Sequence, residues 1–221
     1  RWSHVVIRDT ERSEYLGWAT TGAVTFHRGS VRLQNVSIAH ALAEDALNIV
    51  SAQIAINQLK IDDARSDAFD CDFCQGTLNG LQVSDIGGDG FDVSGSRVSI
   101  ENSRFTNVKD KAISVGEGSN IRGKNLLFQD TGYAVVSKDG SSVQLDRIIL
   151  KNIRDVGFMS YKKKSEYEGV ENITAKDVKS EGEFTLSKSS TGSVITIDGK
   201  ITTNKEIDVE ILYKSELMLK N

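Results

Sequence analysis

Aspartates gather in the first half of the chain, and they are the residues best suited to chemistry. Residues 44–92 hold ten acidic side chains and two basic ones, although the whole chain of 221 residues has a net charge of only −4. Carboxylates held close together repel one another unless a cation, a proton or hydrogen bonds offset the charge. The candidate metal ligands are Asp67, Asp70, Asp72, Asp89 and Asp92.

Three uses suit such a cluster. Ca²⁺ takes about six to eight oxygen ligands, and carboxylates on adjacent strands can supply several of them. Carboxyl groups with different pKa values can instead act as acid and base, or as acid and nucleophile, on a glycosidic bond. The third use is structural, because an Asp at a turn accepts hydrogen bonds from nearby backbone amides. The candidate catalytic residues are Asp70, Asp89, Asp92 and Lys111.

Lys111 belongs to the catalytic set because of a lyase alternative. A polysaccharide lyase removes the proton α to a uronate carboxylate, and this step needs a base and a positive group that neutralises the acid of the substrate. Lys111 is the candidate base nearest to the aspartates.

An internal repeat explains how these residues come together. A small residue followed by alternating apolar positions recurs at a nearly constant interval along the chain. Each unit contains short stretches of period-2 alternation separated by Gly, Ser, Asp and Asn turns. Strands that repeat at constant phase wind into a coil, so the sequence predicts an all-β parallel β-helix with a 22-residue period and about seven or eight turns. The repeat units begin at Ala23, Ala46, Ala68, Gly90, Ala112, Ala134 and Gly157.

Alternation along each strand then assigns the side chains to faces. Phe69 and Phe91 point into the core, so their neighbours Asp70 and Asp92 point outward. Equivalent residues on successive turns stack about 4.8 Å apart. The aspartates therefore share one outward face. Asp45 and Asn48 lie on one side of them, and Lys111 and Ser114 lie on the other.

The segments Ser66–Asp70, Gly87–Ser96 and Asp110–Gly116 resemble right-handed parallel β-helix proteins of the pectate-lyase-like superfamily. The resemblance implies three parallel sheets around a narrow apolar core, secretion or a cell-surface location, and binding or cleavage of polysaccharide. The motifs of the polygalacturonase branch are absent. Gly90-Phe91-Asp92 is similar to part of the alginate epimerase motif, but Val93-Ser94 stands where that motif has Pro-His.

On this basis we expect an extracellular or cell-surface module that binds polysaccharide along the acidic face. A lyase, epimerase or glycoside hydrolase is the first alternative, and a non-catalytic stalk or adhesin segment is the second. Lys162 to Lys164 form a basic run that suits an anionic polysaccharide. The residues expected to contact sugar are Trp18, Lys138, Tyr161 and Tyr167.

Composition and the two ends of the chain indicate which classes of partner to expect. The negative net charge argues against sequence-independent nucleic-acid binding, and no apolar run is long enough to span a membrane. Residues 1–183 are predicted to form the β-helix, with inserted loops at residues 11–18 and 161–167. Residues 184–221 are predicted to form a C-terminal cap or the start of another β module. The first turn lacks a cover, so further domains or a partner are expected there.

The cysteines and histidines offer weaker signals. Cys71 points inward beside Phe69 and is expected to be a buried core thiol, because a disulfide to Cys74 needs a sharp bend in the strand. His40 is expected to be isolated and solvated.

Overall fold

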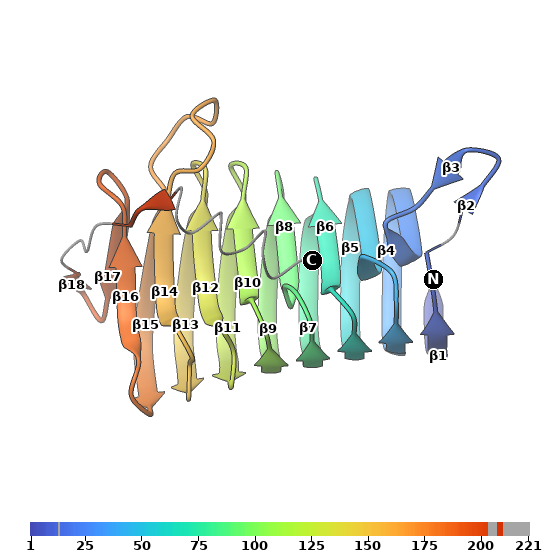
Figure 1. Ribbon diagram of the computed structural model, residues 1–221, viewed down its shortest axis with the longest axis horizontal. Coiled ribbons are helices and arrows are strands. Elements are labelled where there is room, and N and C mark those ends of the chain that lie inside the picture. Colours follow the sequence, from blue (N-terminus) through green and yellow to red (C-terminus); the bar gives the residue numbers. More distant parts are fainter. Residues whose placement is uncertain (13, 203–206, 210–221) are drawn as a thin grey trace.

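The computed structural model describes residues 1–12, 14–202 and 207–209, which form a parallel β-solenoid of about eight turns (Figure 1). Strands on one side of the solenoid run in the opposite direction to strands on the other side, as expected for a chain that winds as a coil. The strands are β1 (Trp2–Thr10), β2 (Glu14–Tyr15), β3 (Trp18–Ala19), β4 (Gly22–Ala41), β5 (Asp45–Ala64), β6 (Asp67–Asp72), β7 (Gln75–Ile86), β8 (Phe91–Ser94), β9 (Arg97–Val108), β10 (Lys111–Gly116), β11 (Asn120–Gln129), β12 (Tyr133–Lys138), β13 (Ser142–Lys151), β14 (Val156–Tyr161), β15 (Asn172–Glu181), β16 (Thr185–Ser189), β17 (Val194–Ile197) and β18 (Lys200–Ile201).

The register confirms the predicted repeat. Phe69 pairs with Phe91, and Phe91 pairs with Ile113, so the same position of the repeat recurs on successive turns at a constant interval. Ile113 then pairs with Val135, and Val135 pairs with Phe158 after a slightly longer interval. Every one of these side chains is fully buried, as the alternation predicted.

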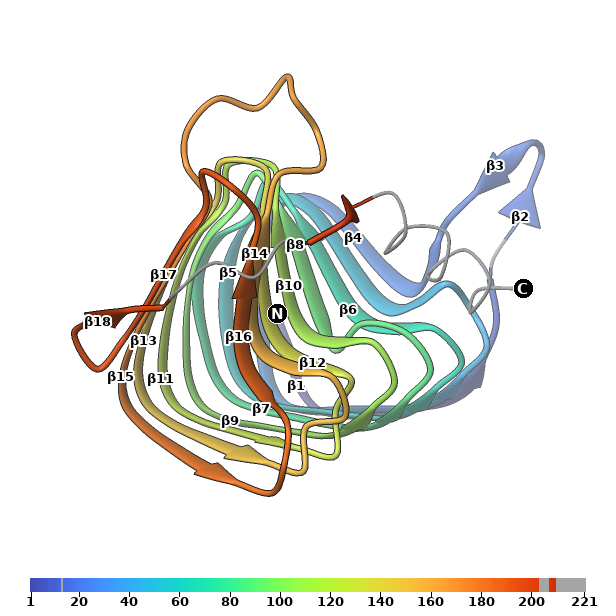
Figure 2. The ribbon, with the colours of Figure 1, turned by 60° about the vertical axis from the view of Figure 1, so that its left-hand side comes forward.

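Two insertions interrupt the repeat where the sequence predicted them. Ile7 pairs with Ile38, a longer step than elsewhere in the solenoid, and the extra residues form the β2–β3 hairpin. Ile148 pairs with Val178, which is again a longer step. The loop between β14 and β15 accounts for this second step and projects from the solenoid in Figure 2.

Two sides of the solenoid present different outer faces. The short strands β6, β8, β10, β12 and β14 form one side, and the longer strands β7, β9, β11, β13 and β15 form the other (Figures 1 and 2). Between them lies a narrow apolar core, in which the rings of Phe105 and Phe128 stack with centroids 5.3 Å apart. The short-strand side carries the acidic cluster.

The longer strands turn a corner at one residue with a left-handed backbone. This residue is Asn102 in β9 (φ 50°) and Asn125 in β11 (φ 55°), and asparagine tolerates that conformation better than most residues. Side chains at the corner and beside it bond along the stack: Asn125 Nδ2 donates to Asn102 Oδ1 at 2.9 Å, and Asn102 Nδ2 donates to Asn79 Oδ1 at 2.7 Å. This polar ladder holds the turns in register.

The parallel ladder continues beyond the predicted boundary at residue 183. β16 pairs with β14, and β17 pairs with β15, before β18 pairs antiparallel with β17. Residues 203–206 and 210–221, which belong to the predicted cap or following module, lie outside the described residues. At the other end, Trp2, Val5 and Ile7 are only partly buried against the core. Among the described residues, no helix is long and apolar enough to cross a membrane.

The expectation of a free thiol at Cys71 is wrong. Cys71 and Cys74 form a disulfide, with Cα atoms 5.9 Å apart, and both residues are fully buried. The bend it needs occurs at Phe73, which has a left-handed backbone (φ 53°) just after β6 ends. Phe73 itself projects to solvent and is 62% exposed.

Candidate functional site

The structure brings the predicted aspartates together on the outer side of the short strands. Asp70 in β6 pairs in register with Asp92 in β8, while Asn48 precedes Asp70 and Ser114 follows Asp92 on the neighbouring turns. Asp72 lies in register between Val50 and Ser94 in the adjacent column. The arrangement of the columns is the one that the sequence predicted.

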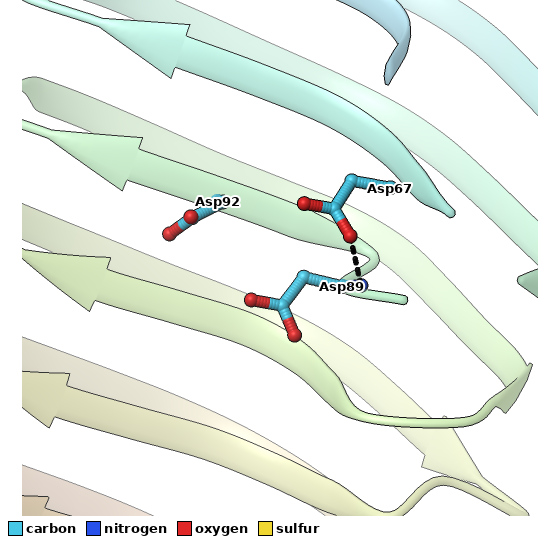
Figure 3. Close-up of side chains that lie close together, drawn as sticks. All are labelled: Asp67, Asp89 and Asp92. Atoms are coloured by element: carbon cyan, nitrogen blue, oxygen red, sulfur yellow. Dashed lines mark hydrogen bonds between the residues drawn. The ribbon is translucent and has the colours of Figure 1, made fainter. Parts of the chain in front are cut away.

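Asp67 and Asp89 have a structural role at the turns before these strands. Asp67 Oδ1 accepts a hydrogen bond from the Asp89 backbone amide at 2.8 Å, drawn as the dashed line in Figure 3. One turn later, Asp89 Oδ1 accepts a hydrogen bond from the Lys111 amide at 3.0 Å. The predicted structural use of aspartates is thus confirmed for these two, which link consecutive turns through side-chain-to-backbone bonds.

The carboxylates of Asp67, Asp89 and Asp92 also converge (Figure 3). One oxygen from each residue lies within 4.8 Å of the others, so the three can hold a metal ion. Oxygen donors of this kind suit a hard divalent cation. The predicted ligands Asp70 and Asp72 are not part of this triad, although they line the same face.

Asp70 is the most strongly perturbed acid in the cluster. Its Oδ2 accepts a hydrogen bond from Asn48 Nδ2 at 2.9 Å, and the same amide reaches Asp45 Oδ2 at 3.3 Å. Burial, followed by repulsion from Asp72 and Asp92, raises the pKa of Asp70 to about 9. Asp70 therefore holds a proton at neutral pH, when an ordinary aspartate is ionised.

The pKa values of the neighbouring aspartates are raised as well. Burial raises the pKa of Asp92, where the charge of Lys138 acts in the opposite direction and Asp89 adds to the increase. Burial is also the main reason that the pKa values of Asp72 and Asp45 are raised. The cluster thus holds fewer negative charges than its carboxyl groups alone suggest. When a cation binds or the pH rises, these carboxyl groups lose protons and the cluster becomes more negative.

The Ser114 hydroxyl was not singled out by the sequence as a ligand. Ser114 is fully buried next to Asp92 in the same column, and its Oγ has no hydrogen-bond partner of normal geometry among the described residues. It nevertheless lies close enough to lower the pKa of Asp92. A buried hydroxyl that lacks a partner beside a carboxylate is an oxygen available to a ligand.

Lys111 is held between two carboxylates. Its Nζ donates a hydrogen bond to Asp110 Oδ2 at 2.7 Å and lies 3.7 Å from Asp89 Oδ1. Only 5% of the side chain is exposed. An ion-paired ammonium is a cation and not a proton acceptor, so these contacts favour charge balance over the role of a lyase base.

Tyr161 does not face solvent as expected. It is fully buried and forms a second apolar cluster with Val136 and Met159 on the outer side of the short strands. Ile207 and Val209 pack against this cluster and cover it. The exposure expected for Tyr161 is wrong, because residues distant in sequence lie over its strand.

The other residues expected to contact sugar differ in their surroundings. Lys138 is partly buried and close enough to Asp92 to oppose the rise in its pKa. Tyr167 is partly exposed in the projecting loop, with Lys164 Nζ 5.9 Å from its ring centroid. The side chain of Trp18 lies outside what the structure describes.

The lysine run is folded back onto the solenoid. Asp139 Oδ1 accepts hydrogen bonds from the backbone amides of Lys163 and Lys164, each at 2.7 Å. Lys164 forms an ion pair with Glu117, and Lys162 Nζ lies 3.2 Å from Glu171 Oε1. Carboxylates of the protein therefore already neutralise the ammonium groups of Lys162 and Lys164. His40 is likewise engaged, with Nδ1 2.6 Å from Asp63 Oδ2, and its expected isolation is wrong.

Comparison with solved structures finds a distant structural likeness to a glucanase domain. The catalytic domain of a GH87 alpha-1,3-glucanase, solved in complex with nigerose, aligns with 83% of this chain at a TM-score of 0.36 and 10% sequence identity. This chain spans about half of the glucanase chain, 49% of its length. No curated protein matches the sequence.

The family is clear from a sequence comparison. The family model described as a right handed beta helix region matches residues 67–221, which is more than half of the chain and includes both the acidic cluster and the later turns. This match agrees with the parallel register of the strands. The chain belongs to the right-handed β-helix family.

Proposed function

We propose that this β-helix binds polysaccharide at the acidic face formed by β6, β8 and β10. The observation that carries the proposal is the pair formed by Asp70 and Asp92. Among the described residues, no backbone amide bonds to either carboxyl group, so turn structure does not account for them as it does for Asp67 and Asp89. Buried acids with perturbed pKa values are typical of functional sites.

The protonation of this pair suits sugar hydroxyls. The raised pKa of Asp70 leaves it a neutral carboxylic acid that can both donate and accept a hydrogen bond at neutral pH. Each sugar hydroxyl both donates and accepts, so it matches the protonated Asp70, and the carboxyl oxygens of Asp92 on the adjacent strand add acceptors. Stacked turns repeat the donors and acceptors along the axis of the solenoid, which suits a linear polymer.

We also propose that Asp67, Asp89 and Asp92 bind Ca²⁺. Each of the three contributes a carboxylate oxygen to the converging triad, and these oxygens come from two adjacent turns of the solenoid. The buried Ser114 hydroxyl lies beside Asp92 on the next strand and adds a further oxygen. A bound Ca²⁺ would offset the repulsion within the cluster and offer open positions to sugar hydroxyls.

Glycoside hydrolysis is the second candidate function, and Asp70 favours it. A general acid in a glycosidase needs a carboxyl group that keeps its proton at working pH beside one that is ionised. Asp70 meets the first requirement, and Asp92 on the adjacent strand is the partner carboxyl group. In this case Asp70 would protonate the leaving oxygen.

We further propose that the protein works outside the cytoplasm. The Cys71–Cys74 disulfide supports this location, because such bonds persist in oxidising compartments and are rare in the cytosol.

Binding and turnover can be tested together on a panel of neutral and acidic polysaccharides, with and without Ca²⁺. Wild type should bind at least one neutral polymer, and the Asp70→Asn/Asp92→Asn variant should lose that binding while it stays folded. Asp155→Asn is the matched control, because Asp155 is exposed and distant in sequence from the cluster. Release of new reducing ends from a neutral polymer by the wild type alone would establish hydrolysis, because a lyase needs a uronate. Equal binding by wild type and the double variant would refute the proposed site.

A further inference from the structure

A second outer face of the solenoid, on the longer strands, has a different chemistry. At the centre of this face, β9 and β11 present Arg97, Ser99, Asn120 and Arg122, which we call the arginine face. Asn120 pairs with Arg97, and Arg122 pairs with Ser99, so the two arginines occupy opposite corners of a square of four side chains. The four belong to two outward columns on adjacent strands.

These four residues and Val98 line a hollow of about 300 Å³. Both arginines are exposed, while Ser99 and Asn120 are partly buried between them. Among the described residues, no carboxylate forms an ion pair with either guanidinium. Two unpaired guanidinium groups, one hydroxyl and one amide therefore face a shared hollow. In a chain of net charge −4, this is an unusual concentration of donors.

Further hollows with positive side chains lie on the same face, on either side of the central hollow along the solenoid. One of about 540 Å³ includes Lys124 and Lys176, and Arg122 lines it together with the central hollow. Another of about 320 Å³ includes Arg1 and Arg32 near the first turns. This face thus carries positive side chains over several turns.

Acidic side chains interrupt this face only in part. Glu101 and Asp146 line the 540 Å³ hollow, and Asp146 Oδ2 lies 3.7 Å from the guanidinium of Arg147. Neither carboxylate belongs to the residues that line the central hollow. An anion in the central hollow therefore contacts hydrogen-bond donors, and no carboxylate lines that hollow.

We propose that the arginine face binds the carboxylate groups of an acidic linear polysaccharide. Guanidinium groups match carboxylates in a planar, bidentate geometry, which lysine cannot reproduce. Hydroxyl and amide side chains such as Ser99 and Asn120 suit the sugar hydroxyls between the acid groups. Because strands stack at a constant spacing, polar side chains of successive turns line the path of an extended polymer at regular intervals.

A single-stranded nucleic acid is the other linear polyanion, and the face favours it less. Binding of single strands relies on aromatic side chains on which the bases stack. The central hollow has none, and Trp2 in the hollow near the first turns packs its ring against Phe26 with centroids 4.8 Å apart. This proposal does not depend on the acidic face, which lies on the other side of the solenoid.

The test is affinity electrophoresis of the full chain through gels that contain polygalacturonate, neutral dextran or single-stranded poly-dT. Wild type should be retarded by polygalacturonate and less by the other two. Arg97→Gln/Arg122→Gln should weaken that binding about tenfold, because each guanidinium contributes charged hydrogen bonds. The matched control, Arg65→Gln/Arg104→Gln, removes the same charge from exposed arginines outside the hollow and should bind like wild type.

The acidic-face variant separates this proposal from the previous one. Asp70→Asn/Asp92→Asn should keep its affinity for polygalacturonate, whatever it does to neutral polymers. The proposal is overturned if wild type binds no polygalacturonate, if it binds poly-dT more tightly, or if the two arginine variants bind equally. Loss of polygalacturonate binding in the aspartate variant alone would place the polymer on the acidic face and overturn it too.

Discussion

Replacing Asp70 by Asn should make the protein more stable at alkaline pH and remove part of the pH dependence of its stability. The pKa of Asp70 is raised to about 9 in the folded protein, chiefly by burial, whereas an unfolded aspartate titrates near about 3.9. Between these values the folded protein holds a proton that the unfolded chain releases. The stability gained from that proton is complete below about pH 4 and is lost as pH rises through about 9.

The difference between the folded and unfolded pKa values of Asp70 sets the size of the pH effect on stability. Each pH unit inside the window costs the wild type up to about 1.4 kcal/mol of unfolding free energy. Between about pH 5 and pH 8 the loss would be about 4 kcal/mol for an isolated group, and we expect about 2–4 kcal/mol because solvent screens a partly exposed carboxyl group. Asn has no proton to lose, and its side-chain oxygen can still accept the hydrogen bond from Asn48.

The assay is urea unfolding followed by circular dichroism at several pH values. Wild type should lose about 2–4 kcal/mol more stability than Asp70→Asn between about pH 5 and pH 8. Asp155→Asn makes the same substitution at an exposed position and should follow the wild-type curve. Parallel pH curves for wild type and Asp70→Asn would refute the idea that Asp70 is protonated in the folded state.

Three further predictions concern the fold. Phe105→Ala should cost about 3–5 kcal/mol in urea unfolding, because Phe105 is fully buried and stacks on Phe128; a cost below about 1 kcal/mol would contradict the packing. Cys71→Ser/Cys74→Ser should lower stability by about 2 kcal/mol, a small effect because the bond closes a short loop, and added reductant should then change nothing further. Asn102→Ala should destabilise by about 1–3 kcal/mol, because it removes two ladder bonds and places a Cβ-bearing residue without a polar side chain at φ 50°. Asn102→Gly should recover part of the backbone cost in the same assay, and equal losses would argue against strain.

The sequence predicted the solenoid and its columns because two periods combine in a simple way. Side chains alternate with period 2 along a strand, and an even number of positions separates Phe69 from its partner Phe91 on the next turn. Both periods therefore keep Asp70 and Asp92 on the same outward face. The sequence also predicted the insertions, because extra residues lengthen the otherwise constant interval between equivalent positions of the repeat.

The predictions for Cys71 and Tyr161 were wrong because one residue or one distant segment departs from the repeat. The Cys71–Cys74 bond depends on the left-handed backbone of Phe73, which alternation cannot reveal. Tyr161 occupies an outward position, but Ile207 and Val209 cover it after the periodicity has faded. A segment outside the repeat can bury a side chain of a strand without changing the periodic sequence pattern of that strand.

The arginine face went unnoticed for a related reason. Arg97 and Arg122 are not equivalent positions of the repeat, and they meet diagonally across two strands. Asp70 and Asp92 are equivalent positions of the repeat, so the repeat alone predicts that they stack, whereas it predicts no diagonal pair. Contacts between different columns need the register and the shape of the outer surface, which the structure supplies.

The central claim is that polysaccharide lies over Asp70 and Asp92. The most direct measurement is a crystal structure of the protein with Ca²⁺ and an oligosaccharide of the neutral polymer that it binds best. We predict sugar hydroxyls within hydrogen-bond distance of both carboxyl groups, and Ca²⁺ held by Asp67, Asp89 and Asp92. An oligosaccharide bound on another face, with both carboxyl groups free of sugar, would contradict the account.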